Sequence, residues 1–199
     1  MDNYGKIIKD NLARLYKNMP DHPEQLLPGR YQDGQLILKA FGSSCRIGSD
    51  GITVDDKTET GVIGILISLY ALHARAEPCI PTPFKAYREI PNSMPYAGAF
   101  ASHSEQILVP HIDAIENNLD LIFETLNGES GTGSEGGDFS FVVRPFPKIK
   151  LYYIFYRADE DFSASTTCLF SNNALSFLTV DALADTGEYT SKKIIELIT

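Results

Sequence analysis

The chain has 199 residues, of which 43% are hydrophobic and 22% are charged, and its formal net charge is −9. These fractions exclude a disordered chain, and the length predicts a single globular domain over residues 1–199. The acidic balance, with a pI near 4.9, argues against nucleic acid and anionic membranes as partners, because polyanions are bound by clustered basic faces. A small anionic ligand held by one or two arginines, or a protein partner, remains compatible with this charge.

The cysteines and the apolar segments predict a cytoplasmic protein without a membrane segment. Cys45, Cys79 and Cys168 are far apart and form no Cys-x-x-Cys pair, which favours a reducing compartment. The first eight residues lack the apolar stretch of a signal peptide. The most apolar run, 62–72, is shorter than the roughly 20 residues that a membrane helix needs.

The first half of the chain predicts helix, then strands, then helix. Apolar residues at helical spacing predict an amphipathic helix over 3–19, within an N-terminal helical segment 1–30. Short strands at 36–41, 44–47 and 52–54 predict an antiparallel meander, with Asp50-Gly51 as a primed turn. A helix capped by Thr58 or Thr60 should run to Arg75. Because it is apolar nearly all round, we expect it to be central and buried. Its stripe of small residues should pack on the sheet and consists of Gly61, Gly64, Ser68 and Ala71.

The second half predicts further helices followed by a block of strands. Ser102 to Glu105 has capping-box spacing and should begin a helix that breaks at Pro110, and a second amphipathic helix should cover 112–126. After a Gly-rich loop at 127–137, strands are expected at 139–144, 149–156 and 165–170. A short helix from Thr179 should end at Gly187, before a final helix at 189–198.

Blocks of strands rather than alternation with helices predict an α+β fold. We expect antiparallel sheets of short strands, packed with a buried central helix and amphipathic helices. The core should cover 35–186, and 187–199 should form a C-terminal helix.

Three motifs imitate known sites without meeting their requirements. The Gly131–Gly136 loop reads G-x-G-x-x-G, but it follows a helix and precedes a strand, the reverse of a dinucleotide site. Residues 159–165 resemble half a calcium loop, but Ala164 and Phe170 occupy positions that need glycine and an acid. The four histidines offer no paired ligand spacing. The sequence therefore predicts no metal and no cofactor.

The polar cluster around Arg88 is the predicted ligand site. If residues 84–88 are extended, Arg88 alternates with core residues on one face, while Lys85, Tyr87 and Glu89 share the other. A half-buried arginine needs a carboxylate or an anionic ligand. Asp138 and Glu160 are possible carboxylate partners, so Arg88 is either a structural ion pair or a ligand anchor. The tentative ligand-binding residues are Arg88, Glu89, Tyr87, Tyr96 and Asp138.

Short motifs identify a family resemblance over residues 36–186. They are Phe41-Gly42, Pro83–Pro91, Tyr96 with Phe100, Gly137-Asp138, Pro145-Phe146-Pro147, Glu160–Ala164, Leu169-Phe170 and Leu178–Asp181. In these motifs the chain resembles the bacterial and archaeal domain-of-unknown-function family 3786, seen mostly in anaerobes. The resemblance implies no activity and no catalytic residues. Some relatives carry an added cysteine-rich iron–sulfur segment, which this chain lacks.

The function predicted from these observations is a small-molecule-binding or accessory protein without catalysis. One alternative is a hydrolase in which Glu89 or Asp138 works with His103. Another is a structural module for protein–protein interaction, which a large exposed apolar patch would favour.

Overall fold

The computed structural model of the chain describes residues 3–131 and 136–199. The α-helices are α1 (Asn3–Lys17), α2 (Val62–His73), α3 (Met94–Phe100), α4 (Ile112–Asn117), α5 (Leu119–Leu126) and α6 (Val180–Ile198). The strands are β1 (Arg30–Gln32), β2 (Gln35–Ala40), β3 (Ser43–Gly48), β4 (Gly51–Val54), β5 (Lys57–Glu59), β6 (Lys85–Ala86), β7 (Glu129–Ser130), β8 (Phe139–Phe146), β9 (Ile149–Tyr156) and β10 (Ser165–Phe170). The short 3-10 helices are η1 (Pro23–Gln25), η2 (Tyr87–Glu89), η4 (Gln106–His111) and η5 (Ala174–Ser176), and η3 (Ala101–Glu105) is a π-helix. The predicted α+β fold is confirmed.

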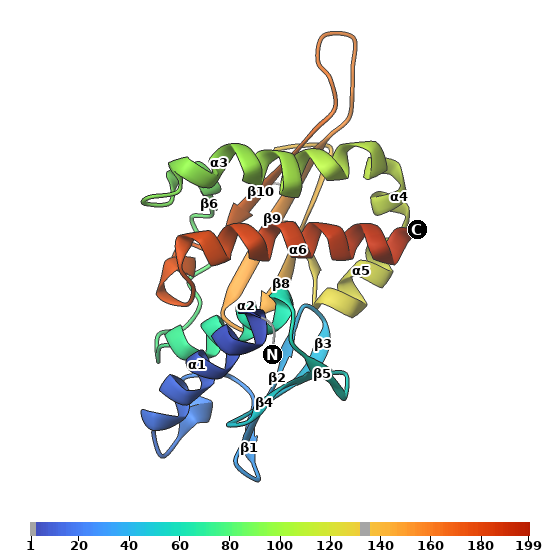
Figure 1. The fold of residues 1–199 in the computed structure, drawn as a ribbon. Coiled ribbons are helices and arrows are strands. Elements are labelled where there is room, and N and C mark those ends of the chain that lie inside the picture. Colours follow the sequence, from blue (N-terminus) through green and yellow to red (C-terminus); the bar gives the residue numbers. More distant parts are fainter. Residues whose placement is uncertain (1–2, 132–135) are drawn as a thin grey trace.

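The first sheet is an antiparallel meander with the order β1-β2-β3-β4-β5 (Figure 1). Two-residue turns join its strands, and positive φ marks the turn pairs 33–34, 41–42 and 55–56. Such pairs form primed turns, whose twist matches that of the strands. Neither Asp50 nor Gly51 has a positive φ, and the turn there lies at 49–50. The predicted hairpin is present, but the prediction of a primed turn at Asp50-Gly51 was wrong.

The second sheet has the order β6-β10-β9-β8-β7, also antiparallel. Side chains on both of its faces are buried, so β9 is a nearly continuous apolar run rather than an alternating one. One face packs against α6, where Tyr153 Oη lies 3.0 Å from Ser191 Oγ. The opposite face carries a smaller apolar cluster of Val142, Tyr152 and Ile154, covered by Phe84.

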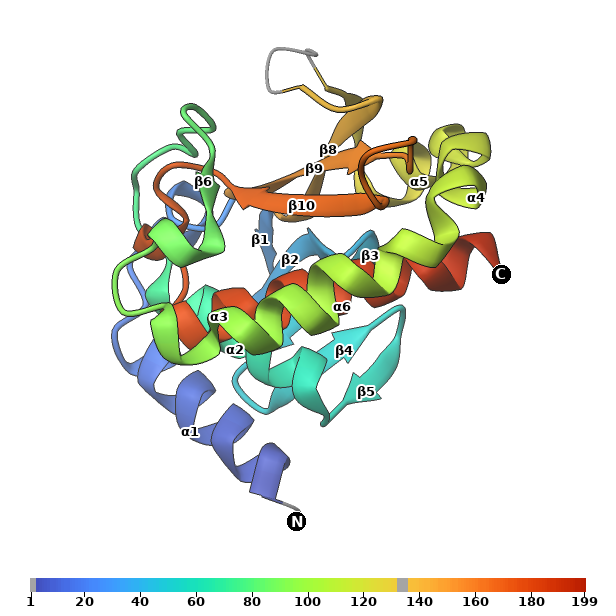
Figure 2. The ribbon, with the colours of Figure 1, turned by 90° about the horizontal axis from the view of Figure 1, so that it is seen from above.

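Helix α6 is the central helix of the fold. It lies across the face of the β8–β10 sheet (Figure 2), between α3 with η3 on one side and α2 on the other (Figure 1). Its buried stripe is made largely of small residues, among them Ala182, Gly187 and Ser191. The helix runs without interruption through Gly187, so the predicted break and the separate helix at 187–199 were wrong.

The two sheets share one hydrophobic core through the turn between β2 and β3. The Phe41 N–H donates to the carbonyl of Pro145 at 2.7 Å. The Phe41 ring packs edge-on against Phe146 and Tyr189, with centroids 4.9 and 4.6 Å away. Phe41 has a φ of 51°, which is uncommon for a bulky residue, and its burial offsets that strain.

The small-residue face of helix α2 packs against α1, while its Tyr70 ring stacks on Phe146 of β8 with centroids 4.4 Å apart. Asn11 Nδ2 donates to Ser68 Oγ at 3.0 Å, and Gly64 lies against the Ile8 side chain. The small-residue stripe therefore admits α1, and the prediction that it packs on the sheet was wrong. The helix is also less buried than expected, because Val62 is 45% exposed. It begins after Gly61 rather than after Thr58 or Thr60, and it ends at His73 rather than at Arg75.

Two further helix boundaries differ from the prediction. Ser102 does not begin a helix: α3 begins at Met94, and residues 101–105 continue it as the π-helix η3. The predicted helix over 112–126 is divided at Asn118, whose φ of −121° and ψ of 22° separate α4 from α5. In the described part of the chain, every helix is too short or too polar to cross a membrane.

Candidate functional site

A pocket of about 420 Å³ lies at the edge of the second sheet, between η2, the α3–η3 helix and β10. It is lined by Ala86, Tyr87, Arg88, Ala97, Gly98, Phe100, Ala101, Glu105 and Thr167. Its volume falls in the range of small-molecule sites, and its lining combines aromatic walls with a few polar groups, as such sites do. We call it the Arg88–Glu105 pocket.

The pocket forms because β6 pairs with β10 over only two residues, Lys85 and Ala86. The chain then turns into η2, and Glu89 Oε2 accepts the Ala86 N–H at 2.7 Å, which holds the turn. The predicted extension of residues 84–88 was therefore wrong beyond Ala86. Past this point no strand of the described residues pairs with the outer edge of β10, and an edge strand presents unpaired backbone groups.

Glu105 caps that exposed edge from the π-helix. Its Oε1 accepts the Cys168 N–H at 2.9 Å, across 63 residues of sequence. The π-helix itself is held by α6, since Ser191 Oγ donates to the Ser104 carbonyl at 2.6 Å. Short π-helical turns within α-helices occur frequently at functional sites. Here the π-helical turn supplies two lining residues, Ala101 and Glu105.

The apolar wall of the pocket is a stack of two rings. Tyr87 lies parallel to Phe100 with centroids 4.4 Å apart, and its hydroxyl donates to the Val180 carbonyl at 2.8 Å. Burial raises the pKa of Tyr87 above its ordinary value. Tyr87 therefore acts as a neutral, fixed part of the wall.

Two opposite charges face this pocket without neutralising each other. Burial raises the pKa of Glu105, while the Cys168 N–H and the more distant Arg88 charge oppose that rise. Arg88 is exposed. Among residues 3–131 and 136–199, neither Arg88 nor Glu105 has an opposite charge within the 4.0 Å of an ion pair. The arrangement can hold a ligand that carries its own anion and its own N–H or O–H donor.

The structure brings together only some of the predicted ligand-binding residues. Tyr87 and Arg88 line the pocket, whereas Glu89 is used as a backbone cap and Tyr96 is exposed on α3 outside the lining. Asp138 lies elsewhere, with its Oδ2 accepting the Arg157 N–H at 2.6 Å. The sequence pattern did not indicate Glu105 as a pocket residue, because its capping-box spacing predicted a helix start.

In the described residues, the histidine and acidic motifs form neither the expected His–carboxylate pair nor a metal site. His103 Nδ1 lies 3.3 Å from Glu188, and no described contact joins it to Glu89 or Asp138. Asp159 Oδ1 accepts the N–H groups of Asp161 and Phe162, which accounts for the acidic turn. Across the described ranges, no three His, Cys, Asp or Glu side chains converge as metal ligands. Residues 132–135 of the Gly131–Gly136 motif lie outside the described residues.

Replacing Glu105 with Gln should change how stability depends on pH. Because burial raises the folded-state pKa of Glu105, its protonated form is favoured in the native state. That stabilisation is fully present below the unfolded-state pKa and is lost as pH rises through the folded-state pKa. We therefore expect Glu105→Gln, which keeps an acceptor for Cys168, to gain stability relative to the parent chain between acidic and neutral pH. Parallel melting curves across that range measure the difference, and a constant difference would contradict the assignment.

The matching family model is a domain of unknown function, DUF3786, and it covers residues 21–193. The resemblance predicted from the short motifs is thus confirmed, over a longer stretch than 36–186. No curated protein and no solved structure matches the chain.

Proposed function

The chain belongs to the domain-of-unknown-function family DUF3786, and we propose from its geometry that it binds a small organic molecule in the Arg88–Glu105 pocket. One observation carries this proposal: a cation and a partly buried carboxyl face the same pocket without pairing. A partly buried carboxylate such as that of Glu105 is expensive to desolvate unless a complementary group meets it, and the exposed Arg88 guanidinium is free to meet an anion.

The ligand that fits carries an anionic group beside a hydrogen-bond donor on a small apolar body. Its anion would bind the Arg88 guanidinium, which offers several N–H donors in a fixed plane. Its donor, such as an ammonium, would bind the free oxygen of Glu105. Phe100 and Ala97 provide the apolar contact. Amino acids and related zwitterions have this chemistry. Binding alone needs only these contacts, so the proposal includes no catalytic step.

A thermal-shift experiment with free amino acids tests the proposal. A ligand selective for the native state at about 100 times its Kd adds about 2.7 kcal/mol, which for a chain of this size corresponds to a melting shift of roughly 5–10 °C. We expect Arg88→Ala to abolish this shift. The control Arg14→Ala removes an exposed arginine from α1 and should keep it.

Matched probes separate the two charges. A simple carboxylic acid tests Arg88 alone and a simple amine tests Glu105 alone, and each should bind more weakly than the zwitterion. Glu105→Gln should remove the preference for the ammonium group. An amino-acid shift that survives Arg88→Ala, or no shift with any probe, would refute this function.

A further inference from the structure

A hollow with a volume of about 820 Å³ is lined by cations. It lies where the outer face of the first sheet meets the ends of β8 and β9. Among the described residues its charged lining consists of Arg30, Lys39, Arg46 and Arg144, without Asp or Glu. We propose that this basic basin binds a small molecule carrying several phosphate groups.

Three of the cations are placed together by the register of the first sheet. Arg30 pairs with Ile37, and Ile37 pairs with Arg46, so the side chains of Arg30, Ile37 and Arg46 share one face. Neighbouring strands lie roughly 4.8 Å apart, which separates the backbones of Arg30 and Arg46 by roughly 10 Å. Lys39 lies two residues along β2 from Ile37 and therefore points to the same face, paired with Ser44.

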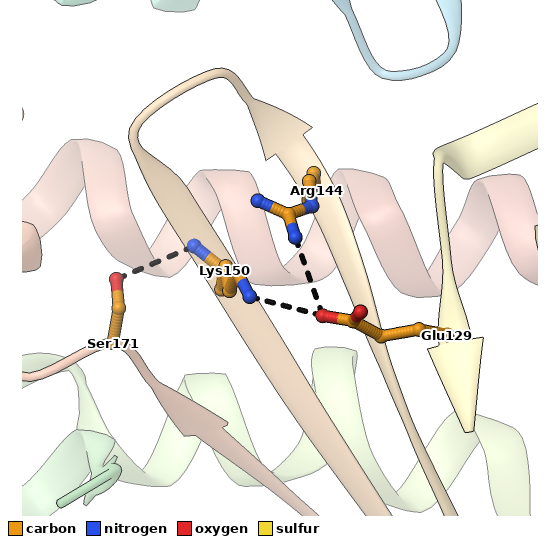
Figure 3. A network of polar contacts seen from close by, with 4 residues as sticks. All are labelled: Glu129, Arg144, Lys150 and Ser171. Atoms are coloured by element: carbon orange, nitrogen blue, oxygen red, sulfur yellow. Dashed lines mark hydrogen bonds and ion pairs between the residues drawn. The ribbon is translucent and has the colours of Figure 1, made fainter. Parts of the chain in front are cut away.

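The fourth cation comes from the second sheet. A bulge between Val143 and Phe146 interrupts the β8–β9 register next to Arg144, and bulges re-aim nearby side chains. Arg144 Nη2 lies 3.3 Å from Glu129 Oε1, and Lys150 Nζ lies 2.9 Å from the same oxygen (Figure 3). One carboxylate thus serves two cations and neutralises neither fully.

Two other carboxylates lie near the basin, and one of them, Asp55, accepts the N–H of the lining residue Ser44 at its Oδ1 over 3.0 Å. Asp56 Oδ1 lies 3.5 Å from Arg46 Nε, and the Asp56 side chain is 87% exposed. Exposed pairs of this kind contribute little to stability and are readily exchanged. Arg30 and Lys39 have no ion pair among the described residues. The basin therefore keeps excess positive charge in a chain whose net charge is −9.

The two walls of the basin are fixed relative to each other. The bond from Phe41 N–H to the Pro145 carbonyl ties the β2–β3 turn to β8. The adjacent Gly42 packs against the Thr125 carbonyl, close to the lining residue Asn127. A preformed site loses little free energy to ordering when it binds.

The spacing of the cations selects the ligand class. The strands that carry Arg30 and Arg46 lie roughly 10 Å apart, so a chain of phosphates can meet both guanidinium groups through separate charge-assisted hydrogen bonds. Binding a nucleic acid requires a long basic track, whereas these cations line one basin of a chain whose net charge is −9. A compact polyphosphate is the chemistry that matches.

Titration calorimetry with inorganic tripolyphosphate tests this proposal. We expect binding that weakens as salt is added, and tripolyphosphate should bind more tightly than orthophosphate. The double variant Arg30→Gln/Arg46→Gln should weaken binding by about tenfold or more for each cation removed. The control double variant Lys9→Gln/Arg14→Gln changes the net charge equally on the exposed face of α1 and should retain the parental affinity.

Several outcomes would overturn the proposal. They are an affinity for orthophosphate equal to that for tripolyphosphate, an equal weakening of tripolyphosphate binding in the control double variant, no tripolyphosphate binding at low salt, or tighter binding of a single-stranded oligonucleotide than of tripolyphosphate. If the double variant fails to fold, Lys39→Gln against Lys9→Gln gives the same comparison with one exposed side chain each. Arg88→Ala should leave tripolyphosphate binding intact, so this result is independent of the amino-acid test.

Discussion

Replacing Gly42 with Ala should lower the free energy of unfolding by about 3 kcal/mol, which combines the cost of left-handed backbone with that of overpacking. Gly42 has a φ of 85°, a conformation that a Cβ disfavours. A Cβ there would also lie 2.4 Å from the Thr125 carbonyl oxygen. That oxygen belongs to the backbone of α5 and cannot move aside without shifting the helix. Urea denaturation measures the loss as a lower midpoint at unchanged slope.

Gly34 is the matched control for this prediction. It occupies the same position of the preceding two-residue turn, with a φ of 75°, but nothing lies within 4 Å of the position that an added Cβ would take. Gly34→Ala should therefore cost only the conformational part, about 1 kcal/mol. Equal losses at the two positions would show that the contact with Thr125 contributes nothing. Gly42 also lines the basic basin, so its substitution should weaken tripolyphosphate binding while Gly34→Ala does not.

Local patterns predicted the elements whose cause is local. The alternation in 36–54 and the turns between its strands predict the first sheet, because a strand exposes one face and each hairpin is closed within a few residues. The same reasoning located β8, β9 and β10 to within a residue or two. Spacing of apolar residues located α1, whose buried side chains include Ile8, Leu12 and Leu15.

Contacts between distant segments were not predictable from local patterns. Gly187 looked like a helix stop, because glycine commonly ends helices. It is instead a close-packing position against Phe100, a residue 87 positions earlier in the chain. Likewise, Gly64 and Ser68 indicated close packing, but the sequence did not show that α1 is the neighbour.

Only part of the candidate pocket was predictable, because it too is assembled by contacts between distant segments. Arg88 stood out because it was expected to alternate with core residues, and Tyr87 because it belonged to the polar cluster beside it. Glu105 comes to this site only through the pairing of β6 with β10 and the π-helical turn, neither of which has a signature in the sequence. Charge alone indicated Asp138 as a partner, and the fold uses it to hold the Arg157 backbone.

Replacing Gly187 with Ala should destabilise the protein by about 1–2 kcal/mol, although the same change inside most helices would stabilise it by nearly 1 kcal/mol. A Cβ at Gly187 would lie 2.5 Å from Phe100 Cε2. The Phe100 ring cannot swing away freely, because it is stacked on Tyr87 and lies 5.6 Å from the Phe170 centroid. Gly98→Ala is the control in α3, where nothing lies within 4 Å of the added methyl group.

The two glycine variants should therefore differ in sign. Gly98→Ala should keep or raise the melting temperature, and Gly187→Ala should lower it by several degrees, since each kcal/mol corresponds to about 2–4 °C for a chain of this size. Because Phe100 is also a wall of the Arg88–Glu105 pocket, its displacement should weaken amino-acid binding by the native protein. A Gly187→Ala variant that melts like its parent would mean that α3 and α6 are less tightly packed than the contact at Phe100 requires. Retained amino-acid binding in a destabilised variant would separate the packing role of Phe100 from its role in the pocket.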